Sequence, residues 1–190
     1  MEIILYNFSW MGFNVLLALI AVLFGWFVKG TKWTLFRIFC GVVWLLFLPN
    51  TLYLLTDIIH LHQNIHQVEG TDKLIVIIQY AVLLLLGIIT YFAAMYPVEK
   101  VAVKNVRSRQ IIFILLINVL VSFGIILGRV KRMNSWYFVT NLPHLLHNSL
   151  QVLMSLRLVF LIFLLTVLST LLYLSFRESL PLIRRRPENV

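Results

Sequence analysis

Long apolar runs, separated by short polar and charged segments, dominate the pattern of side chains along the chain. At 1.5 Å per residue, a helix of about 20 residues spans the roughly 30 Å of hydrocarbon in a bilayer. Five runs come close to that length, so the pattern predicts five transmembrane helices. They cover approximately residues 10–28, 35–56, 74–96, 111–127 and 158–176.

The stretch 136–155 is also apolar, but asparagine, histidine and proline interrupt it. Pro143 suits the first turn of a helix. One helix from there to Phe176 would measure about 51 Å, which is too long for the bilayer. We therefore expect an interfacial or partly re-entrant helix over about 143–155, on the outer side. The predicted fold class is an all-α, polytopic integral membrane helical bundle, with residues 1–190 as a single transmembrane domain.

Composition supports a membrane protein, because 61% of the 190 residues are hydrophobic and only 12% are charged. An ordinary soluble domain is about 45–50% apolar and about 25% charged. The net charge of +9 does not point to nucleic acid, because the cations lie in short segments that flank apolar runs. The sequence contains no phosphate-binding glycine loop, nucleophile elbow or zinc-protease motif.

The charged residues also predict an orientation. Cations gather in the first connection, the third connection and the C-terminal tail, which the positive-inside rule places in the cytoplasm. We expect a multi-pass protein of the cell membrane, with the N-terminus outside, the C-terminus in the cytoplasm and anionic lipids bound at the cytoplasmic face. The cations are Lys29, Lys32, Arg37, Lys100, Lys104, Arg107, Arg109, Arg177, Arg184, Arg185 and Arg186.

The fourth connection departs from this rule. It should be external, yet it carries Arg129, Lys131 and Arg132, and Arg157 follows at its end. Either the topology of the second half differs, or these cations have local partners. We favour local partners, because the cationic tail fits a cytoplasmic end only with five spans.

A row of polar side chains marks the second predicted span. At about 100° per residue they fall within an arc of about 120°. Such groups are costly in hydrocarbon, so they mark a site or a packing seam. They are Asn50, Tyr53, Thr56, Asp57 and His60.

Pro49 precedes this row and removes a backbone hydrogen bond. It should kink the helix and expose a carbonyl near Leu45, which Asn50 could satisfy. Two interpretations stay open: a broken helix that lines a site, as in transporters, or a kink that fits neighbouring helices.

Asp57 lies at the predicted outer end of the second span, at a depth similar to that of Arg129, Arg132 and Arg157. Arginine offers two-pronged pairing to a carboxylate or a phosphate. One interpretation is an ion pair that fastens the second span to the fourth or fifth. The other is a pocket in which the arginines bind an anionic head group or phosphate while Asp57 and His60 transfer protons.

The histidines raise the question of a metal, because His60, His62 and His66 follow the pattern H-x-H-x3-H. A helix would place His62 and His66 on one face, and zinc or copper uses such ligands. A histidine near a membrane surface needs no metal, however, so we expect no metal and no cofactor. Asn14, Gln79, Asn118 and Ser122, within the spans, are predicted to form hydrogen bonds between helices.

Two strings, F-L-P-N-T-L-Y-L-L-T-D-I-I-H-L over 47–61 and G-R-V-K-R-M-N-S-W over 128–136, together resemble the motifs of a bacterial family of multi-pass membrane proteins. This family is the domain of unknown function numbered thirteen sixty-one. The resemblance implies a bacterial plasma-membrane protein with no assigned activity. The family pattern has an acidic residue after N-S-W, where this chain has Tyr137. The matching positions are Pro49, Asn50, Tyr53, Thr56, Asp57, Arg129, Arg132, Asn134, Ser135 and Trp136.

These observations favour a protein that binds or transports a small anionic ligand or lipid head group at an outer polar cluster. The arginines would supply charge, while Asn50, Tyr53 and Asp57 would orient the ligand. One alternative is a membrane enzyme acting on a lipid-linked substrate, with Asp57 or His60 as general base. Another is a structural or assembly protein in which the polar cluster locks helices together. The sequence gives no indication of an oligomeric state.

Overall fold

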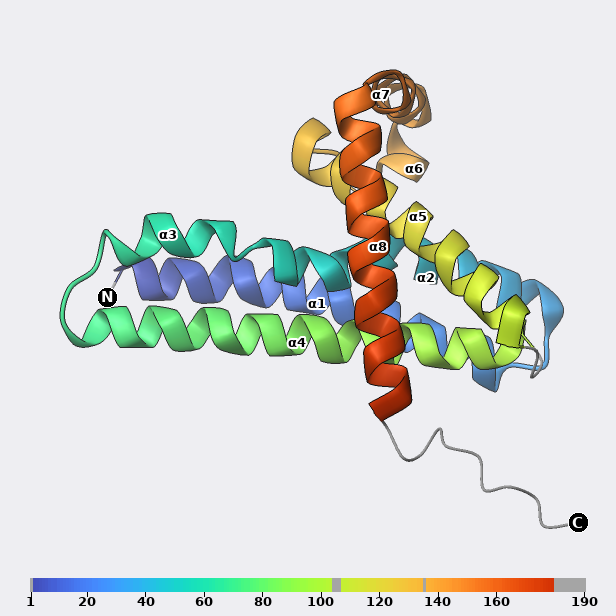
Figure 1. Cartoon of the computed structure of the whole chain (residues 1–190), viewed down its shortest axis with the longest axis horizontal. Helices are drawn as coiled ribbons and strands as arrows, with labels where there is room; N and C mark the ends of the chain where they lie inside the picture. Colours follow the sequence, from blue (N-terminus) through green and yellow to red (C-terminus); the bar gives the residue numbers. More distant parts are fainter. Residues whose placement is uncertain (1, 104–106, 135, 180–190) are drawn as a thin grey trace, which may run out of the picture. The chain divides into compact units, whose positions relative to one another are not determined.

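The computed structural model describes residues 2–103, 107–134 and 136–179, of which 178 and 179 are described by their backbone alone. Within these ranges every regular element is a helix (Figure 1), which confirms the all-α fold class. Five helices are long and apolar enough to cross a membrane, as predicted for a multi-pass membrane protein. They are α1 (Glu2–Gly30), α2 (Thr34–Thr56), α4 (Thr71–Ala102), α5 (Arg107–Lys131) and α8 (Leu156–Ser179).

Three shorter helices lie in the connections. The helix α7 (Leu142–Met154) corresponds closely to the predicted helix over 143–155. The helices α3 (Ile59–Ile65) and α6 (Tyr137–Thr140) have no counterpart among the predicted elements. The polar second connection is therefore partly helical.

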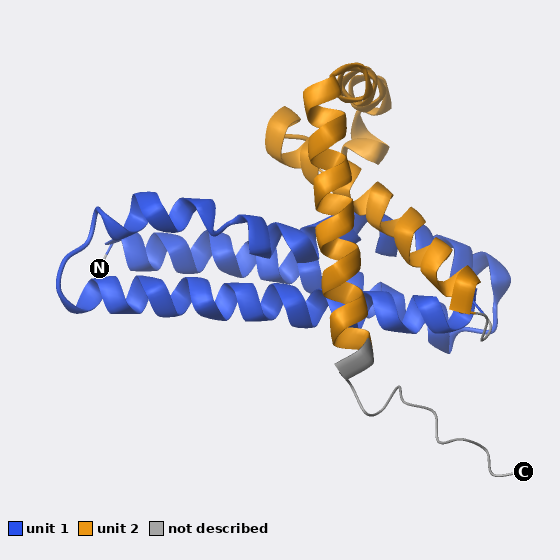
Figure 2. Cartoon of the chain, viewed as in Figure 1, with its two compact units in different colours: residues 1–104 blue, residues 105–190 orange. Residues whose placement is uncertain are grey.

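The chain divides into two compact units, residues 1–104 and 105–190 (Figure 2). Unit 1 contains α1 to α4, and unit 2 contains α5 to α8. The single transmembrane domain over residues 1–190 stays a prediction.

In unit 1 the helix α1 packs against both α2 and α4. Glycine makes the closest approach possible: a Cβ atom on Gly25 would lie 2.7 Å from the carbonyl oxygen of Ala94. The indole N–H of Trp44 donates a hydrogen bond to the same carbonyl at 2.9 Å. These contacts hold the three long helices together at the end of α1.

At this same end the ammonium groups of Lys29 and Lys100 lie over the ring of Tyr96, 5.7 Å and 5.5 Å from its centroid. Such cation–π contacts suit the boundary between hydrocarbon and water, where tyrosine and lysine are enriched. The two lysines at this end of unit 1 therefore both contact the ring of Tyr96.

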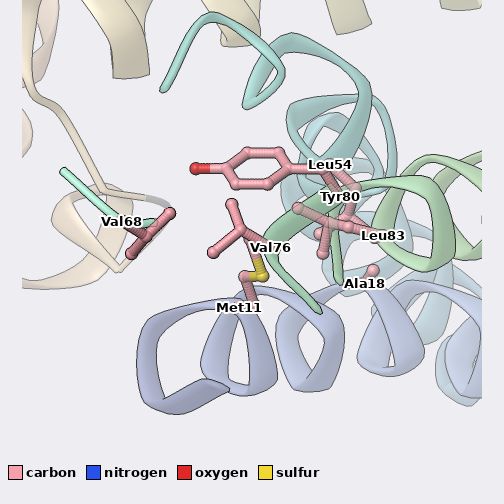
Figure 3. Packing of buried hydrophobic residues seen from close by; sticks show 7 residues of the cluster. All are labelled: Met11, Ala18, Leu54, Val68, Val76, Tyr80 and Leu83. Carbon is pink, nitrogen blue, oxygen red and sulfur yellow. The ribbon is translucent and has the colours of Figure 1, made fainter. Parts of the chain in front are cut away.

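Toward the opposite end of unit 1, a buried apolar cluster surrounds the ring of Tyr80 (Figure 3). Met11 and Ala18 come from α1, and Leu54 comes from α2. Val68, in the connection after α3, joins the same cluster. The cluster therefore links α1, α2 and α4 with the segment that carries α3.

The helices α1 and α4 extend furthest beyond their predicted spans. The helix α1 begins at Glu2 instead of near residue 10, because Asn7 is fully buried and hydrogen-bonded, although it lowers the local hydropathy. The helix α4 continues through Pro97, with Val98 and Glu99 buried. Both extensions are stabilised by tertiary contacts, which a hydropathy pattern does not show.

In unit 2 the helices α5 and α8 run antiparallel. The amide of Asn118 donates a hydrogen bond to the Thr170 hydroxyl at 3.0 Å, and Arg177 donates one to Gln110 at 2.6 Å. The helix α7 packs on both, and its Val152 is fully buried in a cluster with residues of α5 and α8. Unit 2 is therefore a pair of long helices with α7 across one end.

Candidate functional site

The polar row of α2 bonds largely to its own backbone. The helix is continuous through Pro49, and the side-chain amide of Asn50 donates to the Phe47 carbonyl at 3.0 Å, not to Leu45 as expected. The Thr56 hydroxyl donates to the Tyr53 carbonyl at 3.0 Å. These bonds satisfy polar groups in an apolar environment, as a structural role requires.

Asp57 follows the last residue of α2 and is only 2% exposed. Its carboxylate accepts a hydrogen bond of 3.1 Å from the side-chain amide of Asn14 in α1. A buried carboxylate needs such donors, because it has lost its water. The bond between Asn14 and Asp57 therefore joins α1 to the end of α2. The predicted arginine partners belong to unit 2, so that pairing stays a prediction.

His60 departs from the predicted helical arc. Because α2 ends at Thr56 and α3 begins only at Ile59, His60 belongs to a different helix from the rest of the polar row. Its ring lies edge-on to Trp10 of α1, with centroids 6.1 Å apart. The shared arc extends from Asn50 only to the end of α2.

The structure contains a second group of polar side chains, which was not predicted as a site from the sequence. We call this group the amide network. Asn64 of α3 donates to the Asn7 side chain at 2.8 Å and to the Tyr80 hydroxyl at 3.0 Å. The indole of Trp10 donates to Asn7 at 3.1 Å, and Asn7 donates to Gln79 at 3.4 Å. The network comprises Asn7, Trp10, Asn64, Gln79 and Tyr80, and it joins α1, α3 and α4.

Little in the sequence foretells this network, because its members come from three separate segments with no common spacing. The sequence offered a signal for Gln79, an amide within an apolar run, but none for Asn64, which lies in a polar connection. The predicted hydrogen bonds between helices are confirmed for Asn14, Gln79 and Asn118. Ser122 differs: its hydroxyl is buried and makes no hydrogen bond within the described residues.

The histidine pair predicted for one helical face does meet. The rings of His62 and His66 lie edge-on, with centroids 4.7 Å apart, and both side chains are exposed. His60 instead contacts Trp10. Among the described residues, no three histidine, cysteine or acidic side chains gather closely enough to hold a metal ion.

The end of α5 in unit 2 has an unusual backbone. Arg132 directly follows the helix with φ at 52°, in the left-handed region that favours glycine. The amide of Met133 reaches back to the Leu127 carbonyl at 3.2 Å, which closes the last turn. The side chain of Arg132 is exposed.

Other predicted residues share this end of unit 2. The pairing of Asn118 with Thr170 and of Gln110 with Arg177 fixes the register of α5 and α8, so the end of α5 lies beside the start of α8. We call the four cations there the cationic end. Asn134 and Trp136 are exposed nearby in the chain, and Ser135 lies outside the described residues. The cationic end comprises Arg129, Lys131, Arg132 and Arg157.

The family model described as "Protein of unknown function (DUF1361)" matches residues 13–171. The chain belongs to the DUF1361 family. The predicted resemblance is thereby confirmed. Searches of curated proteins and of solved structures found no match.

The DUF1361 match covers both the Asn14–Asp57 bond and the cationic end. It begins after Asn7 and Trp10, so only part of the amide network lies within it. Tyr137, where the resemblance implies an acid, is half-buried against the apolar cluster of unit 2, with its ring 6.2 Å from that of His144. In this DUF1361 protein the position therefore contributes to packing.

The helix α7 of this DUF1361 protein has three distinct faces. Val152 and Leu145 pack into unit 2. A second face exposes a row of leucines to the surroundings, and a third carries histidine, asparagine and glutamine. An exposed apolar face beside a polar one is typical of a helix that lies in a membrane surface. The exposed leucines are Leu142, Leu146, Leu150 and Leu153.

Proposed function

We propose that this DUF1361 protein binds an anionic, phosphate-bearing ligand at the cationic end, on the outer side of a bacterial plasma membrane. The shared chemistry is a phosphate, either in the head group of a membrane lipid or in a small soluble compound. The observation that carries the proposal is Arg132, an exposed guanidinium on a backbone conformation that glycine would adopt without strain.

The strain at Arg132 is the first supporting argument. A side chain in the left-handed region costs about 1–2 kcal/mol, and glycine is the usual residue where a helix ends in this way. Strained residues tend to lie at functional sites. Binding of a phosphate by the guanidinium would explain why arginine occupies this strained position.

Charge and geometry provide the second argument. Arginine binds phosphate through two parallel N–H groups, and the cationic end contains three arginines. Lys131 also donates a hydrogen bond to Gln151 of α7, so the cationic end adjoins the helix with the leucine face. Cations beside an exposed apolar face suit a phosphate at the level of lipid head groups.

A structural role is the second candidate, and unit 1 favours it. Asn50 and Thr56 bond to carbonyls of their own helix, and Asp57 bonds to Asn14. A carboxylate that is 2% exposed is poorly placed to act as a general base on a bound substrate. We therefore assign the polar row of α2 to helix packing and the ligand to unit 2.

The test compares Arg132→Gly with wild type and with Arg109→Gln, which removes an exposed cation from the other end of α5. Each protein is reconstituted in phosphatidylcholine nanodiscs, and the unfolding temperature is recorded against inorganic phosphate. A second series replaces part of the phosphatidylcholine with phosphatidylglycerol. The two series distinguish a soluble phosphate from a lipid head group.

We expect Arg132→Gly to weaken binding about tenfold or more, because a hydrogen bond to a charged group contributes roughly 1.5–3 kcal/mol. Its unfolding temperature without ligand should equal or exceed that of wild type, because the strain is relieved. Arg109→Gln should bind like wild type. Equal affinity for all three proteins in both series would refute the proposal.

A further inference from the structure

A chain of three polar side chains connects α5 to α7 in unit 2. Lys131, in the last turn of α5, donates a hydrogen bond to the side-chain oxygen of Gln151 in α7. The amide nitrogen of Gln151 lies 2.8 Å from Nε2 of His147, four residues earlier in the same helix. Both side chains of α7 are exposed. The cationic end is thereby connected to a histidine.

The direction of these hydrogen bonds defines the protonation state of His147. A lysine ammonium contains only donors, so Lys131 must bond to the amide oxygen of Gln151. The amide N–H groups of Gln151 therefore face His147, and Nε2 of the ring has to accept. A histidine nitrogen accepts only when it carries no proton. This arrangement therefore requires a neutral His147 with its proton on Nδ1.

Protonation of His147 would break this arrangement. Both ring nitrogens would then carry protons, so His147 and Gln151 would direct N–H groups at each other. The ring would have to turn away and donate to another acceptor. Histidine is the side chain that ordinarily changes charge between about pH 5 and 8. Acidification would therefore add a positive charge and a hydrogen-bond donor beside the cationic end.

Among the described residues, no carboxylate at this end of unit 2 can receive the added charge. The helix α7 packs against α5, α6 and α8 (Figure 1). The sequence has no aspartate or glutamate between Glu99 and Glu178, and Glu178 belongs to the opposite end of α8 from Arg157. The other charged or titratable groups at this end are Arg129, Lys131, Arg132, Tyr137, His144 and Arg157. A protonated His147 therefore needs an anion from outside unit 2.

We propose that protonated His147 joins the cationic end in binding the phosphate-bearing anion, an inference that rests on the function proposed above. In the neutral state Gln151 holds both Nε2 of His147 and the ammonium of Lys131. In the protonated state His147 donates an N–H group to the anion beside Lys131. Binding therefore strengthens as the pH falls, and His147 is the residue that makes the site sensitive to pH.

His144 provides the matched comparison. It is exposed like His147 and belongs to the same helix. Its ring contacts Tyr137, with centroids 6.2 Å apart, and its Nε2 lies 3.3 Å from the Asn148 amide. At 1.5 Å per residue, His144 lies about 10 Å from Gln151 along α7, which is about one Debye length at physiological ionic strength. Its charge should therefore affect the anion much less.

The experiment measures anion binding by the full chain at about pH 8 and about pH 5.5. Wild type, His147→Gln, His144→Gln and Arg132→Gly are reconstituted in phosphatidylcholine nanodiscs. The unfolding temperature is recorded against sulfate in one series and against the fraction of phosphatidylglycerol in the other. Both probes keep a constant charge over this range, and the two series distinguish a soluble anion from a lipid head group. The glutamine introduced by His147→Gln can accept from Gln151 but cannot gain a proton.

Wild type should bind at least one probe about fivefold more tightly at the lower pH, the effect of one additional cation beside an anionic head group. His144→Gln should keep this increase, and His147→Gln should show less than a twofold difference between the two pH values. The histidines of unit 1 are present in all four proteins, so they do not affect the comparison.

Two results would overturn the role of His147 and leave the anion site in place. One is the same increase in His147→Gln as in wild type, and the other is an equal loss of the increase in both histidine variants. Equal binding by wild type and Arg132→Gly, in both series and at both pH values, would instead refute the anion site and the role of His147 with it.

Discussion

Asn14 and Asp57 form a hydrogen bond between two side chains that joins α1 to the end of α2. Asp57 is almost completely buried, so the hydrogen bond from Asn14 helps to replace the water that its carboxylate has lost. In lipid the hydrophobic effect does not bring helices together, because lipid chains are as apolar as leucine, so such bonds act alongside van der Waals packing. The interpretation that the polar row of α2 serves helix packing therefore depends on this hydrogen bond.

We expect Asn14→Ala and Asp57→Ala each to lower the free energy of unfolding by about 1–3 kcal/mol, because each removes the hydrogen bond between the two side chains. The double variant should lose less than the sum of the two. Thermal unfolding in detergent measures the cycle, with Gln67→Ala, an exposed position, as control. Strictly additive losses would show that the two side chains do not stabilise each other.

The bounds of some helices were predicted from the sequence more closely than those of others, for a physical reason. A span of lipid length needs a long apolar run, so α2, α5 and α8 were located closely. Hydropathy cannot register a buried amide with partners elsewhere in the chain, so the start of α1 at Glu2 was missed. The helix α3 was missed because it is short and polar.

The candidate site shows the same limit. The polar row of α2 and the arginines of the fourth connection were found because each lies within a few residues of sequence. The amide network depends on contacts between Asn7 and Asn64, which are 57 residues apart, and no local spacing reveals them. The left-handed conformation of Arg132 is equally hidden, because nothing in an arginine signals it.

The faces of α7 predict how this helix meets the membrane. Leu146 belongs to the exposed leucine face and Gln151 to the polar face. We expect a polarity-sensitive fluorophore on Leu146→Cys to emit at shorter wavelength than the same fluorophore on Gln151→Cys, in phosphatidylcholine vesicles. The native Cys40 is buried, so it should label little. Equal emission from both sites would contradict an interfacial position for α7.

For the whole molecule, the orientation predicted from charge can be tested with exposed positions at opposite ends of the spans. Gln63 lies in α3, and Ser108 lies in the first turn of α5. We expect Gln63→Cys to react with a membrane-impermeant maleimide on intact cells, and Ser108→Cys to react only after the membrane is opened. The reverse pattern would invert the topology on which an outer anion site depends.

The anchoring of Lys29 and Lys100 on Tyr96 has a consequence for the kind of bilayer that suits unit 1. The apolar run of α4 from Leu74 to Tyr96 would measure about 33 Å, close to the usual hydrocarbon thickness. With Tyr96 at one boundary, Gln79 lies about 8 Å inside the other. In a thinner bilayer that margin would shrink, and water would compete for the amides of the network. Hydrophobic mismatch would then loosen α1 from α4, so membrane thickness itself would regulate the cohesion of unit 1.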